Sequence, residues 1–132
     1  MPNLSARIED FVEGDAFTIQ RTIKRTASGL ATGITATKAW FTVKEALTDE
    51  DVAALVQKEI TTGDVPGTGQ IENDGTGDVN IVLRFDILTA DTRAISTTER
   101  YYDVQVLLSD STLTTPEVGV IVAVDEVTLT DA

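Results

Sequence analysis

The feature that most constrains the fold is a period of two in the hydrophobicity of residues 79–108. From Val79 to Ile87 every second residue is apolar, and the polar Asn80, Arg84 and Asp86 lie between them. After a polar, turn-rich corner over residues 89–100, the alternation returns over residues 101–108. Side chains alternate faces along a strand, so both segments predict β-strands with one buried and one solvated face. Apolar faces of this size need a second layer to cover them.

Further strands are predicted on both sides of this central pair. They cover residues 16–24, 34–44, 54–61, 70–72 and 118–124. Arg21 falls on the apolar face of the first of these, and we expect it near the strand end with its guanidinium in water. Residues 48–51 carry an N-cap threonine followed by acids, which predicts one helical turn. Seven or eight short strands separated by turns are typical of an all-β, antiparallel sandwich with at most one short helical turn.

The composition limits the chemistry that is open to the chain. It has 132 residues, enough for one domain with a real core, and 42% of them are hydrophobic. It contains no cysteine and no histidine, which excludes disulfides and thiolate metal sites and removes the commonest general base. There is no signal pattern and no apolar run of the roughly 20 residues that span a bilayer, so we expect a soluble chain without its own secretion signal.

The charge is strongly acidic and unevenly placed. The net charge is -12, with six basic and five acidic residues among the first 48 and four and seventeen among the rest. Such a chain repels phosphate backbones, so we expect neither nucleic acid nor a membrane as its partner. Two interpretations stay open: the charge keeps a sheet protein in solution, or it docks on a basic partner surface.

No sequence motif indicates catalysis. Nucleophilic catalysis needs a base beside the nucleophile, and neither a Gly-x-Ser-x-Gly nor a Ser-x-x-Lys motif occurs. We therefore expect no enzyme, no catalytic residues and no cofactor. The loop at residues 73–78 has closely spaced oxygen ligands, which makes Asn73, Asp74 and Asp78 weak candidates for a calcium-like cation. It lacks the EF-hand spacing, so a solvated hairpin turn is the better interpretation.

Three aromatic residues and two apolar residues near the N-terminus are candidates for interface or structural roles. Trp40, the only tryptophan, points away from the apolar face of its strand, so either a loop or arm covers it or it anchors a protein interface. Leu4 and Ile8 in the N-terminal segment are the other interface candidates, because residues 1–12 form either an edge strand or an arm that reaches a neighbour. Tyr101 and Tyr102 follow the long corner, where one tyrosine of a Greek-key sandwich often hydrogen-bonds back across it.

An ordered set of short stretches resembles a tailed-phage family, the N-terminal immunoglobulin-like domain of baseplate upper proteins and related tail proteins. The stretches are Glu13-Gly14-Asp15, Ala39 to Lys44, Asp49 to Lys58, Val82 to Asp86 with Ala90 to Thr92, Tyr101 to Val106, and Asp125 to Thr128. The resemblance implies an immunoglobulin-like sandwich over residues 13–128, followed by a tail at 129–132. It implies a virion structural module that docks onto other virion proteins and often serves as an adaptor, and it carries over no catalytic residue.

The leading hypothesis is therefore a non-enzymatic phage structural protein of the tail or baseplate. We expect it to be made in the host cytoplasm, to reside in the virion and to assemble in several copies. One alternative is a capsid decoration protein on the head surface. Another is a host-surface carbohydrate-binding module, which the small number of aromatic residues disfavours.

Overall fold

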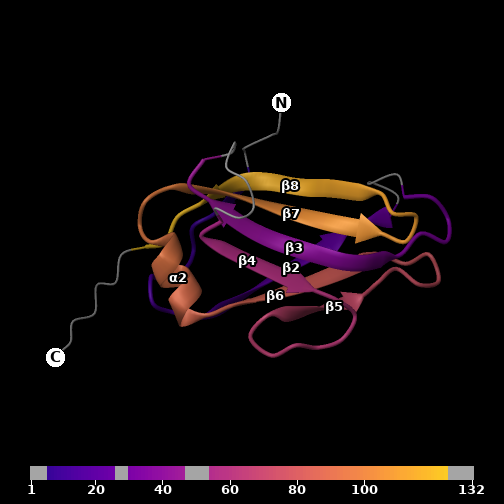
Figure 1. The fold of residues 1–132 in the computed structure, drawn as a ribbon, viewed down its shortest axis with the longest axis horizontal. Helices are drawn as coiled ribbons and strands as arrows, with labels where there is room; N and C mark the ends of the chain where they lie inside the picture. Colours follow the sequence, from indigo (N-terminus) through magenta and orange to yellow (C-terminus); the bar gives the residue numbers. More distant parts are fainter. Residues whose placement is uncertain (1–5, 26–29, 47–53, 125–132) are drawn as a thin grey trace.

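The computed structural model describes residues 6–25, 30–46 and 54–124, and these form two β-sheets and one short helix (Figure 1). The five-stranded sheet has the strand order β1-β8-β7-β3-β4, and the three-stranded sheet has the order β2-β6-β5. The first sheet comprises β1 (Ala6–Ile8), β8 (Leu113–Ile121), β7 (Arg100–Leu108), β3 (Ala36–Lys44) and β4 (Val56–Ile60). The second comprises β2 (Phe17–Ile23), β6 (Ile81–Ile87) and β5 (Gly69–Asn73). The predicted all-β architecture in two layers is confirmed.

Strand pairing is antiparallel except at the N-terminal edge, where β1 runs parallel to β8. Register shifts interrupt the pairs β3–β7, β5–β6 and β7–β8. By contrast, β2 pairs with β6 without interruption from Phe17 opposite Ile87 to Ile23 opposite Ile81. β2 is therefore a regular edge strand of the three-stranded sheet.

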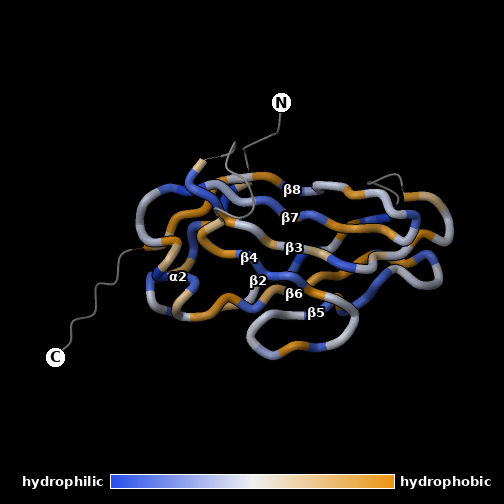
Figure 2. The backbone as a smooth tube through the Cα atoms, in the orientation of Figure 1, coloured by the Kyte–Doolittle hydropathy of each residue, from blue (hydrophilic) through white to orange (hydrophobic). Residues whose placement is uncertain are grey.

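The core lies between the two sheets and is built from the predicted alternation, which Figure 2 shows as alternating colours along the strands. Phe41 of β3 and Phe85 of β6 are fully buried, and their ring centroids are 5.7 Å apart. Val104 of β7 is buried beside them. The two central strands of the sequence thus lie in different sheets, and the apolar face of each is covered by the opposite sheet. The first begins at Ile81, because Val79 is 45% exposed and lies in the preceding turn.

The corner between these strands differs from its prediction. Residues Thr89–Ile95 form the helix α2, although the sequence predicted only turns there. Thr92 and Ile95, one turn apart, are buried, and the Asp91 carboxylate accepts the Leu88 N–H at the helix start. The helix forms because this narrow apolar side covers one end of the core, a signal too short to detect in a polar stretch. The helical turn predicted at residues 48–51 lies outside the described residues.

The two ends of the described chain meet at one edge of the five-stranded sheet. Of the two alternatives for the N-terminal segment, an edge strand is present, since Ala6, Arg7 and Ile8 pair with Gly119, Val120 and Ile121. Gly119 permits this approach, because a Cβ built on it would lie 2.4 Å from the Ala6 carbonyl oxygen. β8 begins at Leu113, earlier than predicted, because a bulge lets Leu113 and Thr114 pair with β7. The predicted tail at 129–132 lies outside the described residues, as does Leu4. None of the described helices is long and apolar enough to cross a bilayer.

Candidate interaction site

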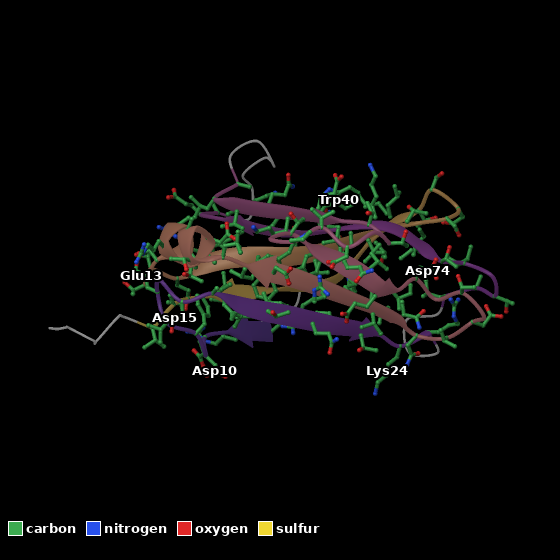
Figure 3. All side chains as sticks on the ribbon, turned by 90° about the horizontal axis from the view of Figure 1, so that it is seen from below. Asp10, Glu13, Asp15, Lys24, Trp40 and Asp74 are labelled. Atoms are coloured by element: carbon green, nitrogen blue, oxygen red, sulfur yellow. The ribbon has the colours of Figure 1, made fainter. Side chains whose placement is uncertain are left out.

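Trp40 lies on the outer face of the five-stranded sheet. Its neighbours across the strands are Glu59 of β4 and Gln105 of β7. Figure 3 shows Trp40 on the opposite side of the molecule from Asp10 and Lys24. The indole N–H donates to the Glu59 carboxylate at 2.9 Å, and the Lys38 ammonium lies 3.8 Å from the same group. The indole is half-buried among side chains of its own sheet. Its role as an interface anchor stays a prediction.

The candidate cation ligands lie at the end of β5 and in the turn that leads to β6, and their oxygens accept hydrogen bonds from separate donors. Asn73 Oδ1 accepts the Gly75 N–H at 3.0 Å, and Asp74 accepts the N–H and hydroxyl of Thr76. These bonds from Thr76 lower the pKa of Asp74 below its usual range. Asp78 accepts the N–H of Gly33, from a different loop, at 2.7 Å. Among the described residues no three acidic side chains gather as a metal site would require.

The positive charge at this end of the molecule is supplied by Arg25. Its side chain is buried, and its guanidinium donates to four backbone carbonyls. These carbonyls belong to Ala31, Ile34, Gly75 and Val79. Asp78 lies 3.8 Å away and balances the charge. Arg25 therefore joins the chain after β2 to the turn before β6, a role that sequence reasoning missed because the acceptors are backbone atoms of distant segments.

A polar bridge connects the two sheets along their open side. Arg21 of β2 donates to Glu117 of β8 at 2.8 Å, and the Tyr102 hydroxyl donates to the other oxygen of the same carboxylate. Arg21 was expected at a strand end with its head in water, but its side chain is 34% exposed and ion-paired. Burial lowers the pKa of Arg21, and the hydrogen bond and charge of Glu117 outweigh this and raise it. Burial, and then the Glu117 carboxylate, raise the pKa of Tyr102.

The two candidate corner tyrosines lie on opposite faces of β7. Tyr102 points into the core, where its ring centroid is 5.6 Å from that of Phe41. Its hydroxyl has a different partner from the predicted one, because the neighbouring strand brings Glu117 to it while α2 fills the corner. Tyr101 is half-buried on the outer face that also carries Trp40.

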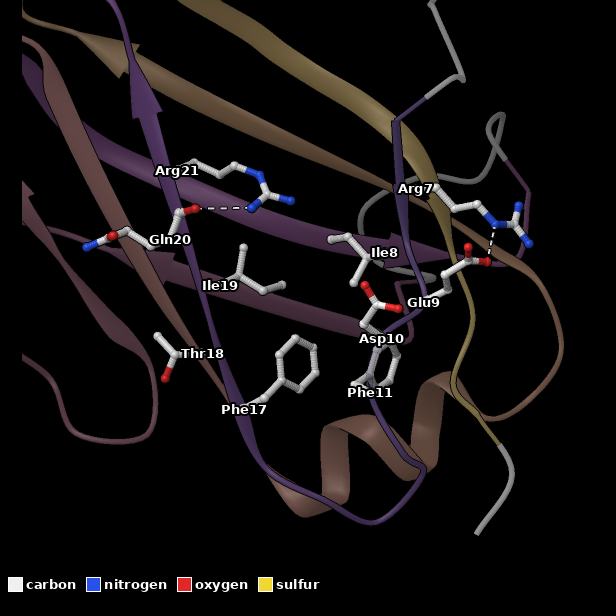
Figure 4. A pocket seen from close by; sticks show the side chains of 10 residues that line it. All are labelled: Arg7, Ile8, Glu9, Asp10, Phe11, Phe17, Thr18, Ile19, Gln20 and Arg21. Atoms are coloured by element: carbon white, nitrogen blue, oxygen red, sulfur yellow. Dashed lines mark hydrogen bonds and ion pairs between the residues drawn. The ribbon is translucent and has the colours of Figure 1, made fainter. Parts of the chain in front are cut away.

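The open side also carries a groove of about 250 Å³ between β1 and β2. Figure 4 shows Phe17, Ile19 and Arg21 of β2 on one side and Ile8 of β1 on the other. Phe11 stacks on Phe17 with ring centroids 4.6 Å apart and closes one end. Ile8, the second interface candidate, thus lines a groove and is partly buried against the core.

Comparison with known proteins gives no relative from which to assign this site. No protein-family model matches the chain, and no curated protein matches it. The resemblance to the phage tail family therefore stays a prediction.

Proposed function

We propose that this chain is an immunoglobulin-like docking module of a tailed-phage virion, which binds other virion proteins and has no catalytic role. The strand order supports the immunoglobulin-like part of this proposal. In immunoglobulin sandwiches one sheet holds strands A, B, E and D and the other holds G, F, C and, in variable-type domains, C′. The orders β2-β6-β5 and β8-β7-β3-β4 correspond to B-E-D and G-F-C-C′.

The position of Tyr102 gives further support. Immunoglobulin domains carry a tyrosine near the start of strand F, two residues before the second cysteine. Tyr102 lies near the start of β7, and the residue two places on is Val104, which is buried. A hydrophobic side chain would then replace the disulfide in this cysteine-free chain.

The docking role is inferred from the outer face of the five-stranded sheet. Tryptophan is enriched at the centres of protein interfaces, where it contributes a large rigid surface and one donor. Trp40 and Tyr101 both lie on this face, among uncharged and mixed-charge neighbours such as Gln105, Lys38 and Glu59. This is the arrangement of an aromatic anchor within a polar rim.

The experiment is incorporation of Trp40→Ala into phage particles, with Gln57→Ala as the matched control on the same face. We expect Trp40→Ala to be lost from particles while its thermal melting stays close to that of the parent chain. Gln57→Ala should be incorporated normally. Normal incorporation of Trp40→Ala would contradict the proposal. Electron microscopy of labelled particles would distinguish a position in the tail from a position on the capsid surface. Substitution is a better test than removal of residues 1–10, because that removes β1 from its sheet.

A further inference from the structure

One edge of the sandwich has less protection against pairing than the others. Within the described residues β2 has β6 on one side and no strand on the other. Natural proteins protect such edges with bulges, prolines, charged side chains (inward-pointing ones included) or short strands. The seven residues of β2 include no proline, their pairing with β6 is unbroken, and their exposed face carries only Thr18, Gln20 and Thr22. The one charged side chain of β2, Arg21, points inward, where Glu117 already neutralises it.

The other described edges are protected. β1 is three residues long, and β5 contains a bulge between Ile71 and Asn73. β4 carries Lys58 and Glu59. The regular β2 edge therefore differs from the other three, and half of its backbone N–H and C=O groups point toward the groove side.

The groove beside β2 defines the strand that would fit. Its apolar lining includes Ile8, Ile19 and Phe17, so an incoming strand would need apolar side chains at alternate positions. Two smaller hollows of about 100 and 220 Å³ continue the depression past Ile23 and Pro116. The three hollows together follow β2 from Phe17 to Ile23.

The chain itself contains a segment with this pattern. In residues 125–132, Val127 and Leu129 alternate with Thr128 and Thr130. The segment follows Val124, which donates its N–H to the Phe11 carbonyl and accepts the Glu13 N–H. These bonds lie on the side of β1 that faces β8, away from the groove. To enter its own groove the chain would have to reverse and cross the connection from Phe11 to β2, so a second copy is the better acceptor.

We propose that residues 125–132 of one copy add as a strand to the free edge of β2 in a second copy and place Val127 and Leu129 in the groove. The contact is head-to-tail, so it propagates into a ring or a filament. The inference deepens the proposed function and rests on it only for its biological setting. The contact involves neither Trp40 nor the outer sheet face.

The test is disulfide cross-linking, which is clean because the chain has no cysteine. Full-length Thr128→Cys is mixed with Thr18→Cys, with Thr22→Cys, or with the control Gln57→Cys on the other sheet. We expect a mixed disulfide with at least one of the two β2 variants and none with Gln57→Cys. Adding Val127→Asp and Leu129→Asp to the Thr128→Cys chain should abolish it. Two positions are used on β2 because a shift of register by four residues moves the contact from one to the other.

Absence of a mixed disulfide with both β2 variants, or an equal yield with Gln57→Cys, would overturn the inference. The cross-link should also form when both chains carry Trp40→Ala. If incorporation into particles depends on Trp40 but no β2 cross-link forms, the inference fails and the proposed function stands. If the cross-link forms but incorporation does not depend on Trp40, the outer sheet face is not the docking surface and the strand contact stands.

Discussion

Arg25 holds one end of the molecule together through backbone carbonyls from two loops. Gly75 makes room for it, since a Cβ on Gly75 would lie 2.7 Å from the guanidinium. Gly75 and Gly77 have φ of 92° and 82°, but a Cβ on Gly77 meets no atom within 4 Å. Substitution at Gly77 therefore measures the cost of backbone strain alone, whereas substitution at Gly75 adds the cost of displacing Arg25.

We predict that Gly77→Ala lowers the free energy of unfolding by about 1 kcal/mol, the cost of a left-handed conformation for a residue with a side chain. Gly75→Ala should cost about 2 kcal/mol more, because Arg25 must shift from its four carbonyls. Urea denaturation of both variants measures the difference. Equal losses would show that Arg25 does not depend on the space at Gly75.

Tyr102 gives a prediction for alkaline pH. Its pKa is raised in the folded chain by burial and by Glu117, so folding favours the neutral phenol. The resulting stability is fully present below the unfolded pKa of about 10 and is lost as the pH rises toward the folded value. The free energy of unfolding should therefore fall more steeply above about pH 10 in the parent chain than in Tyr102→Phe. Parallel pH profiles from urea denaturation would contradict this.

For single residues, the sequence predicted which face of its strand a side chain occupies better than it predicted the contacts of that side chain. The apolar faces of the two central strands were expected inside, and Phe85 and Val104 on these faces are buried. The partners of Arg21 and Tyr102 could not be predicted, because Glu117 reaches them only through the packing of the two sheets. The same holds for Arg25, whose acceptors are main-chain atoms without any residue signature.

At the scale of elements, α2 depends on an ion pair with β4. Lys58 points toward the interior side of its strand, and its ammonium lies 2.7 Å from the Asp91 carboxylate, with side chains 12% and 19% exposed. The same ammonium donates to the Gly67 carbonyl, and Asp91 also accepts the Leu88 N–H. Together these contacts attach the start of the helix to the edge of the five-stranded sheet.

We predict that Asp91→Asn lowers the free energy of unfolding by about 2 kcal/mol, because it leaves a mostly buried ammonium without its counter-charge. The matched control is Glu59→Gln on the same strand, whose ion pair with Lys38 is half-exposed and should contribute less than about 0.5 kcal/mol. Urea denaturation measures both. A loss in Asp91→Asn no larger than in the control would mean that the helix is held by Ile95 and Thr92 alone.

The strands could be predicted because a period of two is a direct consequence of one-sided burial. It placed β2, β3, β4, β6 and β7 to within two residues or so of their ends. The helix was missed because only Thr92 and Ile95 of its seven residues are buried. The start of β8 was missed because its first residues are exposed or half-buried and join β7 across a bulge.

At the scale of the whole molecule, the charge of -12 opposes association of identical copies. The groove beside β2 is close to balanced, with Arg7 and Arg21 against Glu9 and Asp10. Association through residues 125–132 therefore works against long-range repulsion and gains from burial and strand pairing.

We predict that self-association strengthens when sodium chloride is raised from about 20 to about 200 mM, since the screening length falls from roughly 20 Å to below 10 Å. Light scattering at a fixed protein concentration measures it. Association that weakens with salt would indicate attraction between opposite charges and would contradict an apolar strand contact.

In the proposed assembly, the exposed edge strand β2 of one copy is the contact for a neighbouring copy. The most direct test is residue-resolved amide hydrogen exchange at low and at high protein concentration. On assembly, alternate amides of β2, those facing away from β6, should gain protection, while amides of the central strand β6 should not change. Equal exchange of β2 in the dilute and the assembled chain would contradict it.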